Sequence, residues 1–158
     1  MNSIACDGLP LGDQDEPRTC HLVGCFSNVY WSGSLAVTGQ TEQSLRFVLC
    51  KNTACRSATM LFQGDGRSSG QAVGTPDLRA ECTAEPADAS FAVQCNFIYD
   101  IAELADGDQY ELTVLDPSTD TTLHHSTTVV TYKDHSPNGQ GCPPKCRTGI
   151  LDDSTRDQ

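Results

Sequence analysis

Apolar and polar residues alternate with a period of two along most of the chain between residues 29 and 132. This pattern is typical of β-strands that bury one face, because successive side chains of a strand point to opposite faces. Turn residues separate the alternating segments, and one helical turn is expected around Ile101–Ala105. The sequence therefore predicts seven short strands, at residues 31–37, 45–50, 56–62, 78–84, 91–97, 110–114 and 123–132.

Seven short strands joined by turns predict an all-β fold, a seven-stranded antiparallel sandwich. Residues 1–19 are acidic, contain several Gly and Pro residues and lack periodicity, so they are expected to form a flexible leader. Residues 20–146 are assigned to the sandwich domain, with a cysteine-rich loop at its C-terminal end. Residues 147–158 are polar and are expected to form a disordered tail.

Leu104, Gly107 and Tyr110 form an L-x-x-G-x-x-Y segment, which resembles that of fibronectin type III and related immunoglobulin-like domains. The resemblance implies that Tyr110 begins the penultimate strand and that its hydroxyl bonds a nearby backbone group, as in a tyrosine corner. The run from Pro137 to Cys146 is similar to small secreted domains of bacterial surface lipoproteins, which implies a location rather than an activity. The many cysteines depart from the fibronectin pattern.

Nine cysteines in 158 residues indicate either a disulfide framework or metal chemistry. The spacing favours disulfides, because zinc sites usually pair C-x₂₋₄-C motifs with regularly spaced histidines. Eight cysteines lie in local pairs, some beside expected turns, and free buried thiols are the alternative. The predicted pairs are Cys20 with Cys25, Cys50 with Cys55, Cys82 with Cys95, and Cys142 with Cys146. Disulfides in turn predict an oxidising, extracytoplasmic location, either secreted or anchored at the cell surface.

Cys6 is left over once the other eight cysteines pair. A small residue, Ala5, precedes it, as in a bacterial lipobox, although Ser3 stands where leucine is usual. Cys6 is therefore a candidate for lipidation and for a lipid tether to a membrane, and a spare or intermolecular thiol is the alternative. Met1–Ala5 lacks the basic and apolar regions of a signal peptide, so we expect a native signal to have been removed.

The formal net charge of −11 and the scatter of only ten basic residues argue against nucleic acid as a partner. No run of eighteen apolar residues occurs, so no transmembrane segment is expected.

Metal and catalytic motifs are sparse. A zinc site can be assembled on paper from His21, His124, His125 and His135 together with Cys142 and Cys146. Adjacent strand residues such as His124 and His125 point to opposite faces, which weakens this interpretation. The Asp106–Asp108 and Asp13–Asp15 carboxylates are expected to be solvated turn residues rather than calcium ligands. No nucleophile elbow, H-E-x-x-H helix or phosphate-binding loop is present, so no catalytic residue, metal ligand or cofactor is assigned.

The sequence thus favours a non-catalytic secreted or cell-surface module that serves recognition or structure, with a protein or cell-surface ligand as partner. One alternative is an inhibitor or accessory subunit that uses a disulfide-closed loop, either the Lys51–Ala54 turn or the Pro143–Lys145 loop. A zinc-binding protein and a small hydrolase are the remaining alternatives.

Overall fold

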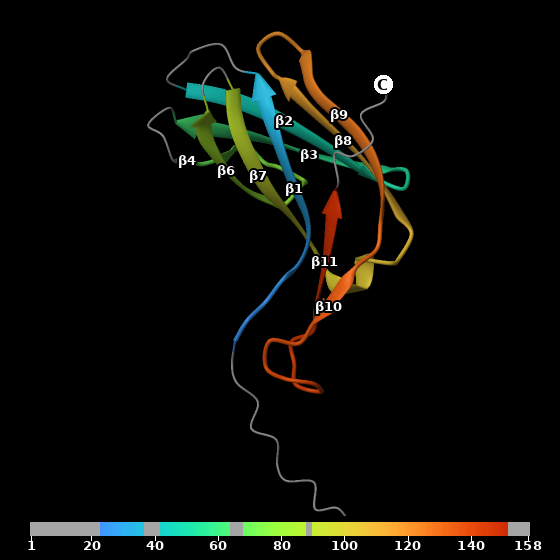
Figure 1. Ribbon diagram of the computed structural model, residues 1–158. Coiled ribbons are helices and arrows are strands. Elements are labelled where there is room, and N and C mark those ends of the chain that lie inside the picture. Colours follow the sequence, from blue (N-terminus) through green and yellow to red (C-terminus); the bar gives the residue numbers. More distant parts are fainter. Residues whose placement is uncertain (1–22, 37–41, 64–67, 88–89, 152–158) are drawn as a thin grey trace, which may run out of the picture.

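The computed structural model describes residues 23–36, 42–63, 68–87 and 90–151, which form two β-sheets facing each other (Figure 1). The six-stranded sheet has the order β10-β11-β1-β7-β6-β4, and the five-stranded sheet has the order β5-β3-β2-β8-β9. In chain order, the elements of the structure are β1 (Ser27–Ala36), β2 (Glu42–Lys51), β3 (Ala54–Gln63), β4 (Ser68–Ser69), β5 (Gln71–Val73), β6 (Ala80–Ala87), β7 (Ser90–Tyr99), the short 3₁₀ helix η1 (Ile101–Glu103), β8 (Asp108–Asp116), β9 (Thr121–Val130), β10 (Lys133–His135) and β11 (Cys146–Leu151).

The core lies between the sheets and is built from the alternating apolar positions. The ring of Phe47 on β2 lies 6.2 Å from that of Trp31 on β1 and 6.1 Å from that of Phe97 on β7. All three side chains are fully buried. The aromatic contacts therefore join the two sheets at their centre, and burial of this apolar surface is the main favourable term in folding.

The all-β expectation is correct, and each of the seven predicted segments overlaps one long strand: β1, β2, β3, β6, β7, β8 or β9. The described residues contain four further, shorter strands that the alternation did not reveal. One pairing also corrects the expected antiparallel topology, because β11 runs parallel to β1, with Asn28 opposite Thr148 and Trp31 opposite Leu151. The remaining pairs are antiparallel.

The C-terminal boundary also needs correction, because residues up to Leu151 belong to β11 rather than to a disordered tail. Gly149 is buried against Val130 and Tyr132, where a Cβ atom would overlap both side chains. This position is open only to glycine, which explains why a core strand looks polar and interrupted in sequence. Residues 152–158 and the predicted leader, residues 1–19, lie outside the described residues.

The loop between β10 and β11 is fastened to the segment that precedes β1. The Asn138 carboxamide accepts a hydrogen bond from the Val23 backbone N–H at 2.9 Å and donates to the Val23 carbonyl at 3.0 Å. It also donates to the Pro143 carbonyl at 2.7 Å. The buried Asn138 thus ties the cysteine-rich loop to the entrance of β1, and Figure 1 shows this loop beyond one end of the sandwich.

Candidate functional site

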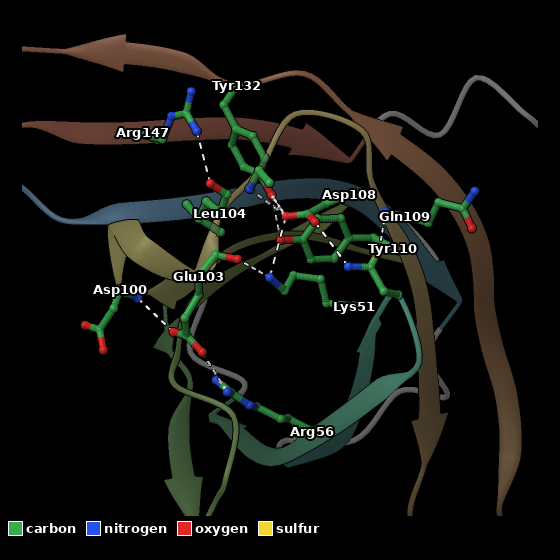
Figure 2. Close-up of polar contacts among 12 residues, drawn as sticks. Lys51, Arg56, Asp100, Glu103, Leu104, Asp108, Gln109, Tyr110, Tyr132 and Arg147 are labelled. Carbon is green, nitrogen blue, oxygen red and sulfur yellow. Dashed lines mark hydrogen bonds and ion pairs between the residues drawn. The ribbon is translucent and has the colours of Figure 1, made fainter.

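A cluster of polar side chains occupies the end of the sandwich near η1 (Figure 2). The Asp108 carboxylate is at its centre and accepts hydrogen bonds from the Ala105 backbone N–H at 3.0 Å, Asn52 at 3.1 Å and the Tyr132 hydroxyl at 3.1 Å. Lys51 lies 3.6 Å away as an ion pair. Burial alone would raise the pKa of Asp108, but these hydrogen bonds and the Lys51 charge outweigh it and hold the pKa below its ordinary value.

Glu103 links η1 to the strands of the five-stranded sheet. Its carboxylate accepts a hydrogen bond from the Asp100 backbone N–H at 3.0 Å, and the Arg56 guanidinium donates to it at 2.8 Å. Both hydrogen bonds lower the pKa of Glu103, and the bond from the Asp100 backbone has the larger effect. Lys51 donates to the Glu103 backbone carbonyl. Arg56 and Lys51 also lie 5.6 and 5.8 Å from the centre of the Tyr99 ring, within the range of cation–π contacts.

Tyr110 is buried at this end, as the L-x-x-G-x-x-Y resemblance implies, but its hydroxyl bonds a side chain. The Tyr110 and Tyr132 hydroxyl oxygens lie 2.7 Å apart, and burial raises the pKa of both phenols. The expected bond from Tyr110 to a nearby backbone group is therefore replaced by the Tyr132 hydroxyl, which itself donates to Asp108. Gly107, at φ +90°, turns the chain into β8 in a conformation that other residues rarely adopt.

The geometry of this cluster supports a structural role. Its carboxylates, phenols and Lys51 bond one another or nearby backbone groups across η1, β2, β3 and β8. Asp106 of the predicted turn pair likewise accepts a hydrogen bond from the Tyr132 backbone N–H at 2.9 Å. Such satisfied networks fix a unique packing. The Lys51–Ala54 turn is part of it, because Asn52 and Lys51 point into the cluster rather than projecting from the domain.

Three disulfides lie within the described residues. The Cys50–Cys55 and Cys82–Cys95 bonds that the spacing predicts are present. The predicted local bonds of Cys25 and Cys146 are wrong, because these two cysteines bond each other across a sequence separation of 121. The parallel pairing of β1 with β11 places the starts of these strands side by side, which proximity in sequence cannot reveal. Cys142 is also disulfide-bonded, and Cys6 and Cys20 lie outside the described residues.

The histidines do not assemble a metal centre within the described parts of the chain, where no three His, Cys, Asp or Glu side chains converge. His124 is half-buried 5.0 Å from the Trp31 ring, whereas the exposed His125 lies 3.9 Å from Glu111 and 3.1 Å from Thr113. The two neighbours thus point to opposite faces of β9. Cys142 and Cys146 are in disulfides and are not available as thiolate ligands. His21 lies outside the described residues.

A second feature is a hollow on the outer face of the six-stranded sheet, with a volume of about 320 Å³. Strand register places its side chains in two neighbouring rows. One row runs from Tyr30 on β1 through Asn96 on β7 to Glu81 on β6. The next row runs from Gln94 on β7 to Thr83 on β6 and continues to β4. The volume lies at the lower end of the range for small-ligand pockets.

The hollow differs from the polar cluster because several of its polar side chains have no bonding partner in the described structure. Within the described residues, Glu81, Thr83 and Gln94 have no side-chain hydrogen bond or ion pair and are exposed. The Cys82–Cys95 disulfide lies between the two rows, since Cys82 and Cys95 are directly opposite each other. This bond fixes the register of β6 against β7 and therefore the spacing of the exposed side chains.

Asn96 is held in place from one side only. The buried Asn28 carboxamide donates to the side-chain amide oxygen of Asn96 at 2.6 Å, and its own amide oxygen accepts from the Thr148 hydroxyl at 3.1 Å. This chain of bonds crosses β11, β1 and β7 and orients the Asn96 side chain. Its amide N–H₂ group, by contrast, has no partner in the described structure. An oriented amide with free donors is a suitable group for binding a polar ligand.

The sequence analysis did not identify these residues. Each occupies the polar position of an alternating strand, which by itself indicates only a solvated face. Their convergence depends on the register of β1, β7 and β6, which the sequence pattern does not specify.

None of the described segments forms a helix with the length and hydropathy that a membrane span needs. No protein-family model, curated protein or solved structure matches the chain.

Proposed function

We propose that this chain is a non-catalytic recognition module of a secreted or surface-anchored protein, and that it binds its partner through the hollow on the six-stranded sheet. The observation that carries the proposal is the contrast between the two polar regions. The cluster near η1 uses its polar atoms internally, whereas the hollow presents Glu81, Gln94 and the Asn96 amide without partners in the described structure.

The disulfides support the extracytoplasmic part of the proposal. Three disulfides lie within the described residues, and such bonds persist in oxidising compartments. A tether through Cys6, which lies outside the described residues, would hold the domain near a membrane, and this stays a prediction.

The strand order supports an immunoglobulin-like arrangement. When β1, β2, β3, β6, β7, β8 and β9 are taken as strands B, C, C′, D, E, F and G, the sheets show the orders B-E-D and C′-C-F-G. Tyr110 then lies on strand F, where a tyrosine corner belongs. Two features differ from that family: β11 occupies the place beside strand B, and the Cys82–Cys95 bond lies within a sheet rather than between sheets.

The alternatives receive less support. An inhibitor that inserts the Lys51–Ala54 turn is disfavoured because Lys51 and Asn52 are bonded into the cluster near η1. The Pro143–Lys145 loop is exposed, but its Pro143 carbonyl is bonded by Asn138.

The test is binding of the oxidised, fluorescently labelled domain to intact cells and extracellular material of the producing organism. The hollow variant Gln94→Ala is compared with Gln109→Ala, since Gln109 is also an exposed glutamine on a strand, but lies on β8. We expect the wild type and Gln109→Ala to bind and Gln94→Ala to bind about tenfold more weakly. Equal binding of all three proteins would exclude the hollow, and no binding by any would contradict the recognition function.

A further inference from the structure

The chemical character of the hollow narrows the class of ligand. Among the described residues that line it, only Glu81 carries a charge, and none is a lysine, arginine or histidine. An anionic ligand would meet no cation among these described residues and would be repelled by Glu81 and by the net charge of −11. Phosphorylated, sulfated and nucleic-acid ligands are therefore disfavoured.

A cationic ligand fits the hollow only in part. An ammonium group can bond the Glu81 carboxylate, but it carries donors and no acceptor. Gln94 can turn its amide oxygen toward such a group, but the Asn96 amide oxygen is already bonded to Asn28, so the Asn96 N–H₂ donors would be left facing the ammonium group. A ligand that satisfies the whole hollow must accept hydrogen bonds from Asn96 and donate to Glu81 at the same time.

Hydroxyl groups meet this requirement, because each both donates and accepts. Several hydroxyls on one rigid ring could engage Glu81, Gln94, Thr83 and Asn96 together. Tyr30 forms one end of the row that contains Asn96 and Glu81. Its neighbour across the β1–β11 pair is the exposed Ile150, which is 57% accessible. An aromatic and an aliphatic side chain at this margin can cover the C–H face of a ring whose hydroxyls point along the sheet.

We propose that the hollow binds an uncharged saccharide, with Glu81, Gln94 and Asn96 bonding its hydroxyls and Tyr30 packing against a sugar ring. This inference rests on the proposed function and names the ligand class of the same site. Most of the hollow lies on the face formed by β1, β7 and β6, although Ser69 of the edge strand β4 borders it. Recognition by the side chains of this face therefore differs from addition of a peptide strand to an edge.

The experiment titrates the oxidised domain with a panel of neutral oligosaccharides: cellohexaose, xylohexaose, mannohexaose, maltoheptaose and N-acetylchitohexaose. Binding is followed by isothermal calorimetry and by backbone amide shifts in NMR spectra. Because few groups make contact, we expect a dissociation constant on the order of 0.1–1 mM for at least one sugar. The shifted amides should lie on β1, β6 and β7.

Two hollow variants have matched controls on the other sheet. Gln94→Ala is compared with Gln109→Ala, and Glu81→Gln with Glu111→Gln; all four residues are exposed on strands. We expect each hollow variant to lose binding about tenfold or more and each control to bind as the wild type does. Unchanged melting temperatures would show that the variants are folded.

Other results would overturn the saccharide inference. One is that no sugar of the panel binds at concentrations up to about 10 mM. Another is that the hollow variants bind sugar as the wild type does. The third is that 1,5-diaminopentane binds and the sugars do not. A second measurement distinguishes failure of the saccharide inference from failure of the proposed function. The cell material is treated with protease or with periodate before the binding test. If hollow-dependent binding is lost after protease and survives periodate, the recognition function stands and the ligand is not a saccharide.

Discussion

The hydroxyl oxygen of Tyr110 lies 2.7 Å from that of Tyr132, and the Tyr132 hydroxyl donates a hydrogen bond to the buried Asp108 carboxylate at 3.1 Å. The two tyrosines join β8 to the segment between β9 and β10, so they connect the five-stranded sheet to the strand that leads into the other sheet.

Tyr110→Phe should lower the free energy of unfolding by about 1 kcal/mol, the usual cost of one partnered hydroxyl. Tyr132→Phe should cost more, because the Tyr132 hydroxyl serves both Tyr110 and Asp108. Urea unfolding of the two variants measures the difference. Equal and negligible effects would mean that the hydroxyls are not bonded in solution.

Each disulfide should contribute to the free energy of unfolding according to the length of the chain segment that it closes. In the chain-entropy model, removing the Cys25–Cys146 bond by a double substitution to serine should cost about 5 kcal/mol, against about 2 kcal/mol for Cys50–Cys55. Denaturant unfolding compares the two variants. Peptide mapping without reductant checks the pairing, and a bond between Cys142 and Cys146 would contradict the structure.

The free energy of unfolding should fall in acid because the carboxylates near η1 become protonated. The pKa values of Asp108 and Glu103 are held below their ordinary values of 3.8 and 4.5. A carboxylate with a lowered folded-state pKa contributes stability that is complete above its unfolded-state pKa and is lost as the pH falls through the folded-state pKa. We expect the free energy of unfolding to fall between roughly pH 5 and pH 2.

The Asp108→Asn variant isolates one of these groups. It should cost about 1–3 kcal/mol at pH 7 through weakened hydrogen bonds, and its difference from the wild type should shrink at pH 2–3. Glu103→Gln should show the same trend. A difference that stays constant across this range would assign the loss in acid to other groups.

Gly33 lies under the Trp31 ring, where a Cβ atom would overlap the indole. Gly33→Ala should therefore destabilise the domain by about 1–3 kcal/mol through overpacking. Gly24→Ala is the matched control, because nothing lies within 4 Å of a Cβ atom there. Thermal unfolding should separate the two variants, and similar melting temperatures would show that the ring can move aside.

The strands that the sequence pattern predicted are those with a clear period of two, such as Phe91–Phe97 within β7. The pattern could not reveal β11, because its buried Gly149 has no side chain to signal a core position and its partner β1 lies about 120 positions earlier. Local cysteine pairs across hairpins were predictable from their turns. Cys25 and Cys146 were not, because their contact depends on the tertiary pairing of distant strands.

The residues of the hollow could not be predicted from the sequence for the same reason. Tyr30, Asn96 and Glu81 come from three separate segments, and each looks like an ordinary solvated residue on its own. Only the pairing of β1 with β7 and of β7 with β6 brings them into one row.

The Cys25–Cys146 bond also determines how the domain would respond to mechanical tension. A pulling force applied between Cys25 and Leu151 has a short covalent route through the sulfur bridge and along the six residues of β11. The residues between the two cysteines, which include the hollow and the aromatic core, lie outside that load path. While the bridge is oxidised, a force applied between these two points therefore bypasses residues 26–145.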